Sequence, residues 1–154
     1  MRILFLLLIS TSTLAQTANN RHTPEEKAVL ATVQALFDTM RDRDTTAAAA
    51  LLLPDGMNFI AIDGRDSLMR WPNAAFVDQL KQPGVQARER MWDAEVRVRG
   101  KIAQVWAPYD LYVNGSFRHC GIDAFTLIFE NNRWRITGAA FTVEKKDCPP
   151  GRPE

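Results

Sequence analysis

Three short turn signals in the second half of the chain constrain its fold more than any other feature. They are Arg99-Gly100, Asn114-Gly115 and Asn131-Asn132, and the segments around them are rich in Val, Ile, Phe, Tyr, Trp and Thr. Such residues favour strands, and Asn-Gly is typical of hairpin turns because both positions need a positive φ. The segment that extends to residue 145, with Asp93 to Lys145 as its clearest part, therefore predicts four strands in an antiparallel meander, of which the first covers residues 86–98.

The turns also predict the register of this sheet. If Asn114-Gly115 is a two-residue loop, His119 lies opposite Asp110 and Asp123 lies opposite Trp106. Side chains alternate along a strand, so the strands sort into two largely apolar faces, and we expect both to be covered. A β-bulge in either central strand would exchange the two faces beyond it. One predicted face carries Gln104, Trp106, Asp110, His119, Asp123, Phe125, Leu127, Phe129, Trp134 and Ile136; the other carries Ala103, Val105, Ala107, Tyr109, Leu111, Cys120, Ile122, Ala124, Ile128, Phe141 and Val143.

The first half of the chain predicts helices. Thr23 can cap a helix that begins at Pro24, Glu26 completes a capping box, and apolar residues recur at helical spacing as far as Met40. A second, Ala-rich helix follows Asp44, then a short strand over 57–62 and a third helix over 74–80. Helices followed by an antiparallel meander predict an α+β fold. We expect a conical half-barrel, with the N-terminal helices packed on a curved four-stranded antiparallel meander with a short extra strand, and a pocket between the first helix, the third helix and the sheet.

The N-terminus has the pattern of a secretory signal. Met1-Arg2 precedes a short apolar run and small residues that end at Ala15. We predict residues 1–15 as a signal peptide cut after Ala15, 16–22 as a disordered mature N-terminus, 23–146 as the domain and 147–154 as a Pro-rich tail. The protein would then be secreted or periplasmic. The alternative is that the apolar run is a buried strand or helix.

Composition and cysteine count limit the number of domains, the kinds of partner and the kinds of site that we expect. The 154 residues suffice for one domain, and 19 basic against 18 acidic residues give no sign of a nucleic acid or anionic membrane partner. No apolar run is long enough to span a membrane. Two histidines without suitable spacing predict no metal site, and we expect no cofactor. In an oxidising compartment Cys120 and Cys148 predict a disulfide; the alternative is two free thiols.

Several motifs together resemble the nuclear transport factor 2-like superfamily, in its polyketide-cyclase-like and ketosteroid-isomerase-like branch. They are the capped first helix, Arg43-Asp44, Pro54-Asp55-Gly56, and the meander segments 105–109, 119–125 and 132–136. The resemblance covers residues 23–143. It implies a conical α+β barrel with a pocket at its open end and frequent dimerisation through the outer sheet face. It leaves the activity open, because this fold hosts isomerases, dehydratases, cyclases, hydrolases and binding modules.

Two acids are the candidate catalytic residues. Asp63 is nearest to the base of isomerases in this family, although Asp63-Gly64 is also an ordinary turn. Where the family's donor Tyr would sit, the first helix has the apolar residues Leu36, Phe37 and Met40, which argues against steroid-type isomerisation. Asp123 sits mid-strand among apolar residues, where burial would raise its pKa and suit it to general acid–base catalysis. The alternative is a structural Asp bonded to Trp106 or to the backbone.

A possible dyad and a pocket complete the candidate sites. His119 and Asp110 could form a catalytic dyad, or a solvated cross-strand pair. The side chains expected to line the pocket are Phe37, Met40, Phe59, Trp71, Phe76, Trp106 and Phe125.

Three functions remain open at this point. The first is binding of a small apolar or aromatic molecule, with the ligand unknown. The second is a lyase, isomerase or cyclase that uses Asp123 with Asp63. The third is a module that homodimerises through the face bearing Val105, Ala107, Ile122 and Ala124.

Overall fold

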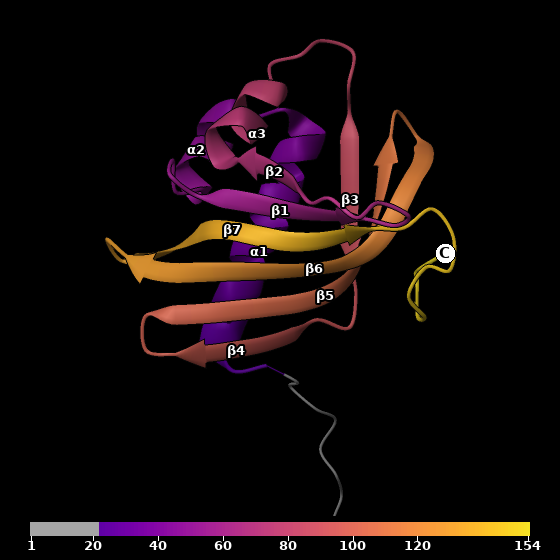
Figure 1. The fold of residues 1–154 in the computed structure, drawn as a ribbon. Coiled ribbons are helices and arrows are strands. Elements are labelled where there is room, and N and C mark those ends of the chain that lie inside the picture. The colour runs from indigo at the N-terminus through magenta and orange to yellow at the C-terminus, as the bar shows by residue number, and fades with distance from the viewer. Residues whose placement is uncertain (1–21) are drawn as a thin grey trace, which may run out of the picture.

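The structure is a computed structural model that describes residues 22–154 (Figure 1). The predicted signal peptide and residues 16–21 lie outside this range, so the cleavage site stays a prediction. The elements, in chain order, are α1 (Pro24–Asp42), α2 (Thr45–Leu51), β1 (Met57–Ile62), β2 (Met69–Pro72), α3 (Asn73–Gln79), β3 (Ala87–Met91), β4 (Glu95–Arg99), β5 (Ile102–Val113), β6 (Ser116–Glu130) and β7 (Arg133–Val143).

The two N-terminal helices begin where their capping residues lie. The Glu26 backbone N–H donates to the Thr23 hydroxyl at 3.2 Å, and the Thr23 N–H donates to the Glu26 carboxylate at 2.9 Å. This is the predicted capping box. Helix α1 ends at Asp42, and the Arg43 that caps it has a left-handed φ of 58°. The Asp44 carboxylate then caps α2 by accepting from the Ala47 N–H. Both helix starts could therefore be predicted from short-range chemistry alone.

The strands form one curved, open, mixed sheet in the order β2-β1-β7-β6-β5-β3, with β4 pairing with the same edge of β5. All pairs are antiparallel except β1 with β7. The α+β class, the curved meander and the helices on one side confirm the predicted fold. The strand count is higher than expected for two reasons. The first meander strand is divided at Asp93, whose φ is 43°, and β2 forms within the segment expected to be a loop.

The predicted register holds at the β5–β6 turn and then shifts by one residue. Val113 pairs with Ser116 and Tyr112 with Phe117, but a bulge then places Leu111 opposite His119. A second shift lies between Thr126 and Leu127 in the β6–β7 pair. The predicted faces were therefore wrong for much of the sheet.

In the observed sheet Asp123 pairs with Ala107 rather than with Trp106, and Asp110 pairs with Cys120 rather than with His119. Trp106 is consequently 54 % exposed. The proposed dimer face is divided as well: Val105 and Ala107 point into the core and are buried, whereas Ile122 and Ala124 lie on the other side of the sheet.

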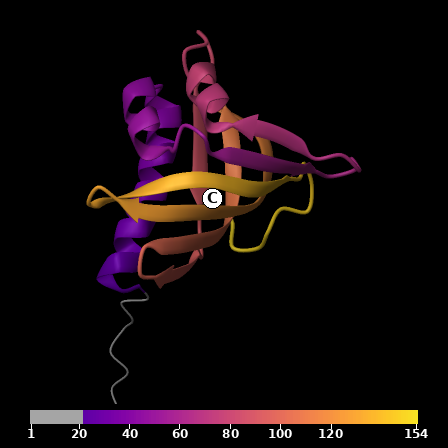
Figure 2. The same cartoon turned by 60° about the vertical axis from the view of Figure 1, so that its left-hand side comes forward.

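The helices cover the concave face of the sheet. Figures 1 and 2 show α1 running across that face, α2 and α3 gathered at one end, and β3 curling across the direction of β1. The core forms between α1 and the sheet, and its buried side chains are Val29, Val33, Leu36, Phe37, Leu52, Ala103, Val105, Ala107, Phe125, Leu127, Trp134, Ile136 and Ala139. The sheet curves so that β3 also packs against α1, and a space remains at the end where α3 sits.

A disulfide joins Cys120 of β6 to Cys148, which confirms the predicted bridge. It holds the C-terminal tail (residues 147–154) against the convex face, where the Trp92 indole N–H donates to the Pro150 carbonyl at 2.8 Å. Disulfides are typical of oxidising compartments. Within residues 22–154, no helix has the length and apolar character needed to cross a bilayer.

Candidate functional site

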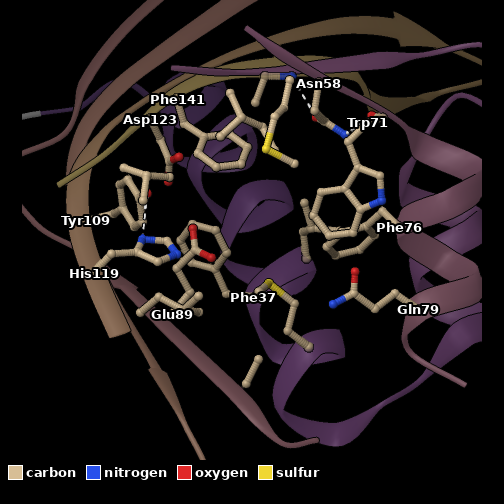
Figure 3. A pocket seen from close by; sticks show the side chains of 18 of the residues that line it. Phe37, Asn58, Trp71, Phe76, Gln79, Glu89, Tyr109, His119, Asp123 and Phe141 are labelled. Carbon is tan, nitrogen blue, oxygen red and sulfur yellow. Dashed lines mark hydrogen bonds between the residues drawn. The ribbon is translucent and has the colours of Figure 1, made fainter. Parts of the chain in front are cut away.

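The space between the helices and the bent part of the sheet is a cavity of about 550 Å³. Its walls come from α1, α3 and the concave face of the sheet, where the pocket was expected, and also from β2, which was expected to be a loop. Most of the lining side chains are aliphatic or aromatic, and the polar ones gather mainly toward β3, β5 and β6 (Figure 3). This combination of apolar walls with a few grouped polar atoms is typical of small-molecule sites.

Five of the seven side chains expected to line the pocket do so, namely Phe37, Met40, Trp71, Phe76 and Phe125. Phe125 and Phe37 pack with ring centroids 6.0 Å apart, and Trp71 and Phe76 with centroids 5.4 Å apart. Phe59 and Trp106 do not line the cavity and are 40 % and 54 % exposed. Phe59 is on the far side of β1 from Ile60, and Trp106 is turned outward by the register shift.

Asp123 is the predicted acid that the structure places in the cavity. It is 2 % exposed, and its Oδ2 atom receives no hydrogen bond from any donor among the described residues. Figure 3 shows its carboxyl group directed into the cavity above Tyr109. The Trp106 indole, which the sequence offered as a partner, is on the opposite face. A buried carboxyl without a donor is costly in its charged form, so Asp123 is poised to hold a proton or to receive one from a ligand.

Glu89 of β3 is the polar neighbour of Asp123 that sequence reasoning missed. The two carboxyl groups are in hydrogen-bonding contact, which requires that one of them carry a proton. The signal was the alternation in β3: Ala87 and Met91 point to the concave side, so Glu89 between them does too, while Arg88 and Arg90 point out. Because Arg88, Glu89 and Arg90 are three charged residues in succession, the polarity pattern alone did not single out Glu89.

Burial and mutual repulsion disturb the titration of this pair. Burial raises the pKa of Glu89 to about 7, with a contribution from the nearby charge of Asp110, while the hydrogen bond with Asp123 opposes the rise. Burial also raises the pKa of Asp123 well above its ordinary value, and the Glu89 charge and hydrogen bond raise it further. Two carboxyls so close cannot both ionise readily. Asp123 therefore holds the proton, and Glu89 changes charge near neutral pH.

Tyr109 and His119 lie beside the two acids. The Tyr109 hydroxyl donates to the Thr142 carbonyl at 2.6 Å and lies 3.0 Å from His119 Nδ1. A phenol has only one proton, so Nδ1 must carry a hydrogen and donate it to the Tyr109 oxygen. His119 Nε2 is then an acceptor, and Figure 3 shows the second ring nitrogen turned toward the cavity. Burial, with Lys145 nearby, lowers the pKa of His119 and keeps the ring neutral.

The structure does not bring the other predicted catalytic residues together. Asp110 lies on the convex face, where Arg90 and Arg152 both bind its carboxylate, so it forms no dyad with His119. Burial would raise the pKa of Asp110, but the hydrogen bonds from these two arginines outweigh burial and hold it below the ordinary value. Asp63 follows the end of β1, is exposed, and does not line the cavity.

The remaining polar side chains of the cavity lie away from this cluster. The Asn58 amide is fully used: it donates to the Trp71 carbonyl and to Asn73, and it accepts from the Ala139 N–H. Arg70 of β2 stacks over the Phe59 ring at 5.9 Å and is the one Lys or Arg among the described lining residues. Across residues 22–154, no group of three or more His, Cys, Asp or Glu side chains is arranged to hold a metal ion.

A family model described as putative lumazine-binding matches residues 24–142, which is most of the chain. The chain belongs to this family. The family shares the nuclear transport factor 2-like fold, so the superfamily predicted from the motifs is confirmed. A search of curated proteins found no match.

Several solved structures have the same fold as this chain. One is a nuclear transport factor 2-like protein from Cytophaga hutchinsonii, with a TM-score of 0.67, 11 % identity, and coverage of 79 % of this chain and 99 % of that one. Another, from Novosphingobium aromaticivorans and described as having a cystatin-like fold, has a TM-score of 0.60, 16 % identity, and coverage of 80 % and 84 %.

A third similar structure is described as a putative dehydratase from Streptomyces avermitilis. Its TM-score is 0.61, its identity is 12 %, and the match covers 79 % of this chain and 97 % of that one. Identities this low establish the shared fold and no shared activity. Fold and family together indicate a ligand-binding or isomerase-like domain.

Proposed function

We propose that the protein is an exported domain that binds a compact, mainly apolar small molecule in the cavity between α1, α3 and the sheet. The observation that carries this proposal is the cavity itself. Its volume of about 550 Å³ lies within the range of small-molecule sites, and its walls are apolar side chains on helices and strands. Rigid apolar walls with few polar groups favour a ligand whose body is hydrophobic.

The experiment is a binding screen with a matched pair of variants. Ala87 lines the cavity and its neighbour Arg88 points to solvent. Ala87→Trp should fill part of the cavity, and Arg88→Trp should place the same side chain outside it. Apolar, aromatic and heterocyclic compounds, lumazine included because of the family's description, are tested by thermal shift and calorimetry.

We expect a compound that stabilises the native protein and Arg88→Trp but not Ala87→Trp. A compound that stabilises all three equally would bind elsewhere. If no compound distinguishes the two variants, the cavity is not a binding site and the proposal fails.

A second function is favoured by one specific observation, the Glu89–Asp123 pair. A base with a pKa of about 7 beside a protonated acid suits proton transfer at neutral pH. We propose the pair as the acid and base of a lyase or isomerase reaction, with Glu89 replacing Asp63 as the residue that assists Asp123. Exchange of ligand C–H for deuterium, followed by NMR, should be lost in Glu89→Gln. Equal exchange in that variant would exclude the reaction.

A further inference from the structure

The polar end of the cavity, defined as Glu89, Tyr109, His119 and Asp123, presents acceptors to the interior. The single proton of Tyr109 is given to the Thr142 carbonyl, and the Nδ1 proton of His119 is given to Tyr109. His119 Nε2 therefore offers a lone pair. The proton held between the two carboxyls stays within the pair, which leaves their remaining oxygens as acceptors.

Among the described lining residues, those on β3, β5, β6 and β7, which surround the polar end, include no Lys or Arg. When Glu89 is ionised the pair carries one negative charge, and the lining contributed by α1 is apolar: Leu36, Phe37 and Met40. Arg70 is on β2, at the opposite end of the strand order from β3. The arginines that neutralise Asp110 are on the convex face. Buried charges are normally paired, so a cation is missing from this end of the cavity.

Asp123 Oδ2 gives an independent indication of a ligand. This atom is buried, lacks a donor among the described residues, and belongs to a side chain that is 2 % exposed and directed into the cavity (Figure 3). A buried acceptor without a donor is uncommon in a folded protein, because it loses its bond to water without replacement. The donor that is lacking would have to come from the bound molecule or from its solvation shell.

We infer that the cavity takes an amine: a molecule with an apolar or aromatic body and one protonated nitrogen seated between Glu89, Asp123 and His119 Nε2. An ammonium group supplies three donors and one positive charge, and the polar end offers acceptors and one negative charge. This inference rests on the proposed binding function and specifies its ligand class. An anionic ligand is disfavoured, because its charge would lie beside that of Glu89.

Binding of the cation should be linked to pH. The titratable groups beside the pair are Tyr109 on β5 and His119 on β6, with Asp110 across the sheet. The lining side chains that α1 and β7 contribute are apolar. A bound ammonium stabilises the ionised carboxyl, so it lowers the pKa of the pair and releases a proton. The affinity should then rise as the pH increases from about 6 to 8, while an alkyl amine remains protonated up to a pH of roughly 10.

The test uses three probes of the same shape: naphthylethylamine, naphthylethanol and naphthylacetic acid. Calorimetry with the full mature protein at pH 6, 7 and 8 gives each affinity, and two buffers of different ionisation enthalpy give the number of protons released. We expect the amine to bind at least about tenfold more tightly than the alcohol at pH 8, because hydrogen bonds to charged groups are stronger than those between neutral groups. The acid should bind weakest.

Variants assign the preference to its residues. Glu89→Gln and Asp123→Asn should each retain binding of the alcohol and lose most of the preference for the amine. Glu95→Gln, an exposed acid on β4, should retain it. The uncharged alcohol needs the cavity but not the charge of its polar end. A variant that no longer binds the alcohol has therefore lost its fold, and its result with the amine is set aside in favour of the other variant.

The outcomes separate the two proposals. If the alcohol binds as tightly as the amine, or if Glu89→Gln keeps the preference, the amine inference is wrong while the binding function stands. If no probe binds the native protein but another compound in the screen does, the amine inference is likewise wrong. If nothing binds in the cavity, both fail together.

Discussion

The side chain of Glu89 gives the folded protein an acid that titrates near neutrality. Its pKa of about 7, against an ordinary value of 4.5, means that between these two pH values the folded protein keeps a proton that the unfolded chain releases. Stability therefore falls as the pH rises through this window and stays reduced above it. The difference in pKa corresponds to roughly 3 kcal/mol.

Glu89→Gln removes this penalty. We expect the variant to be more stable than the native protein by roughly 1–3 kcal/mol at pH 8 and no more stable at pH 4, as measured by urea unfolding at both pH values. Glu95→Gln, on the exposed face of β4, is the control and should change stability little at either pH. An equal gain at both pH values would contradict a raised pKa at Glu89.

Sequence reasoning found one residue of this pair and not the other. Asp123 was recognisable because it is an isolated acid between apolar neighbours. Glu89 lies between Arg88 and Arg90. Its side chain points into the cavity because β3 is a separate short strand that pairs with the edge of β5. Single-residue patterns identify the unusual side chain, but they do not identify the partner that a curved sheet brings to it from another strand.

At the scale of secondary-structure elements, the close packing of β7 against β1 requires glycine at position 138. A Cβ atom at Gly138 would lie 2.0 Å from the Met57 carbonyl oxygen of β1, beside the register shift between β6 and β7. Gly138→Ala should therefore cost at least about 2 kcal/mol in chemical unfolding, because the backbone of β1 must move. Gly64→Ala, where nothing lies within 4 Å, should cost only about 1 kcal/mol through its positive φ. Equal costs would contradict the close approach.

The disulfide between Cys120 and Cys148 also contributes to stability. It spans a sequence separation of 28 residues, and chain-entropy arguments give such a loop roughly 3–4 kcal/mol. Cys148→Ser should lose about this much in urea unfolding. A reducing agent should lower the stability of the native protein to that of the variant and leave the variant unchanged. A reductant effect on the variant would show that something other than the bridge is responsible.

The tail that this bridge anchors could be predicted only in part. The Cys120–Cys148 pairing follows from the cysteine count, but the destination of Arg152 does not. Its guanidinium binds the Asp110 carboxylate at 2.9 Å and lies over the Phe117 ring at 4.4 Å. The same bulge that invalidated the predicted faces also placed Asp110 on the convex side, where the tail can reach it. Hairpin turns can be predicted from the sequence because they require particular residues. Bulges cannot be predicted in the same way, because many residue types can occupy them.

At the scale of the whole molecule, the convex face of the sheet is the surface through which two copies of the chain could associate. Trp106 and Ile102 are 54 % and 58 % exposed on it, and the homodimer expected from the resemblance stays a prediction. If the native protein is a dimer through this face, Trp106→Glu should yield a monomer of unchanged circular dichroism in sedimentation experiments. A native protein that remains monomeric at high concentration would contradict the prediction.

Export is the second prediction at this scale. Expression of the full chain in a host with a secretory pathway should give a mature protein that begins at Gln16, with an intact mass that also shows the two hydrogens lost in the disulfide. Replacing Leu6 with Arg should retain the chain inside the cell by breaking the apolar run. A mass that includes residues 1–15 in the exported fraction would contradict the predicted cleavage.

The parallel pairing of β1 with β7 has a consequence for synthesis. Strand β1 (Met57–Ile62) is synthesised well before its parallel partner β7 (Arg133–Val143). Until β7 emerges, the β1–β2 hairpin has an open edge and the wall formed by Ile60 and Phe141 is incomplete. A chain that lacks β7 thus exposes the apolar surface that the folded protein encloses, and the cavity is completed only once β7 has been synthesised.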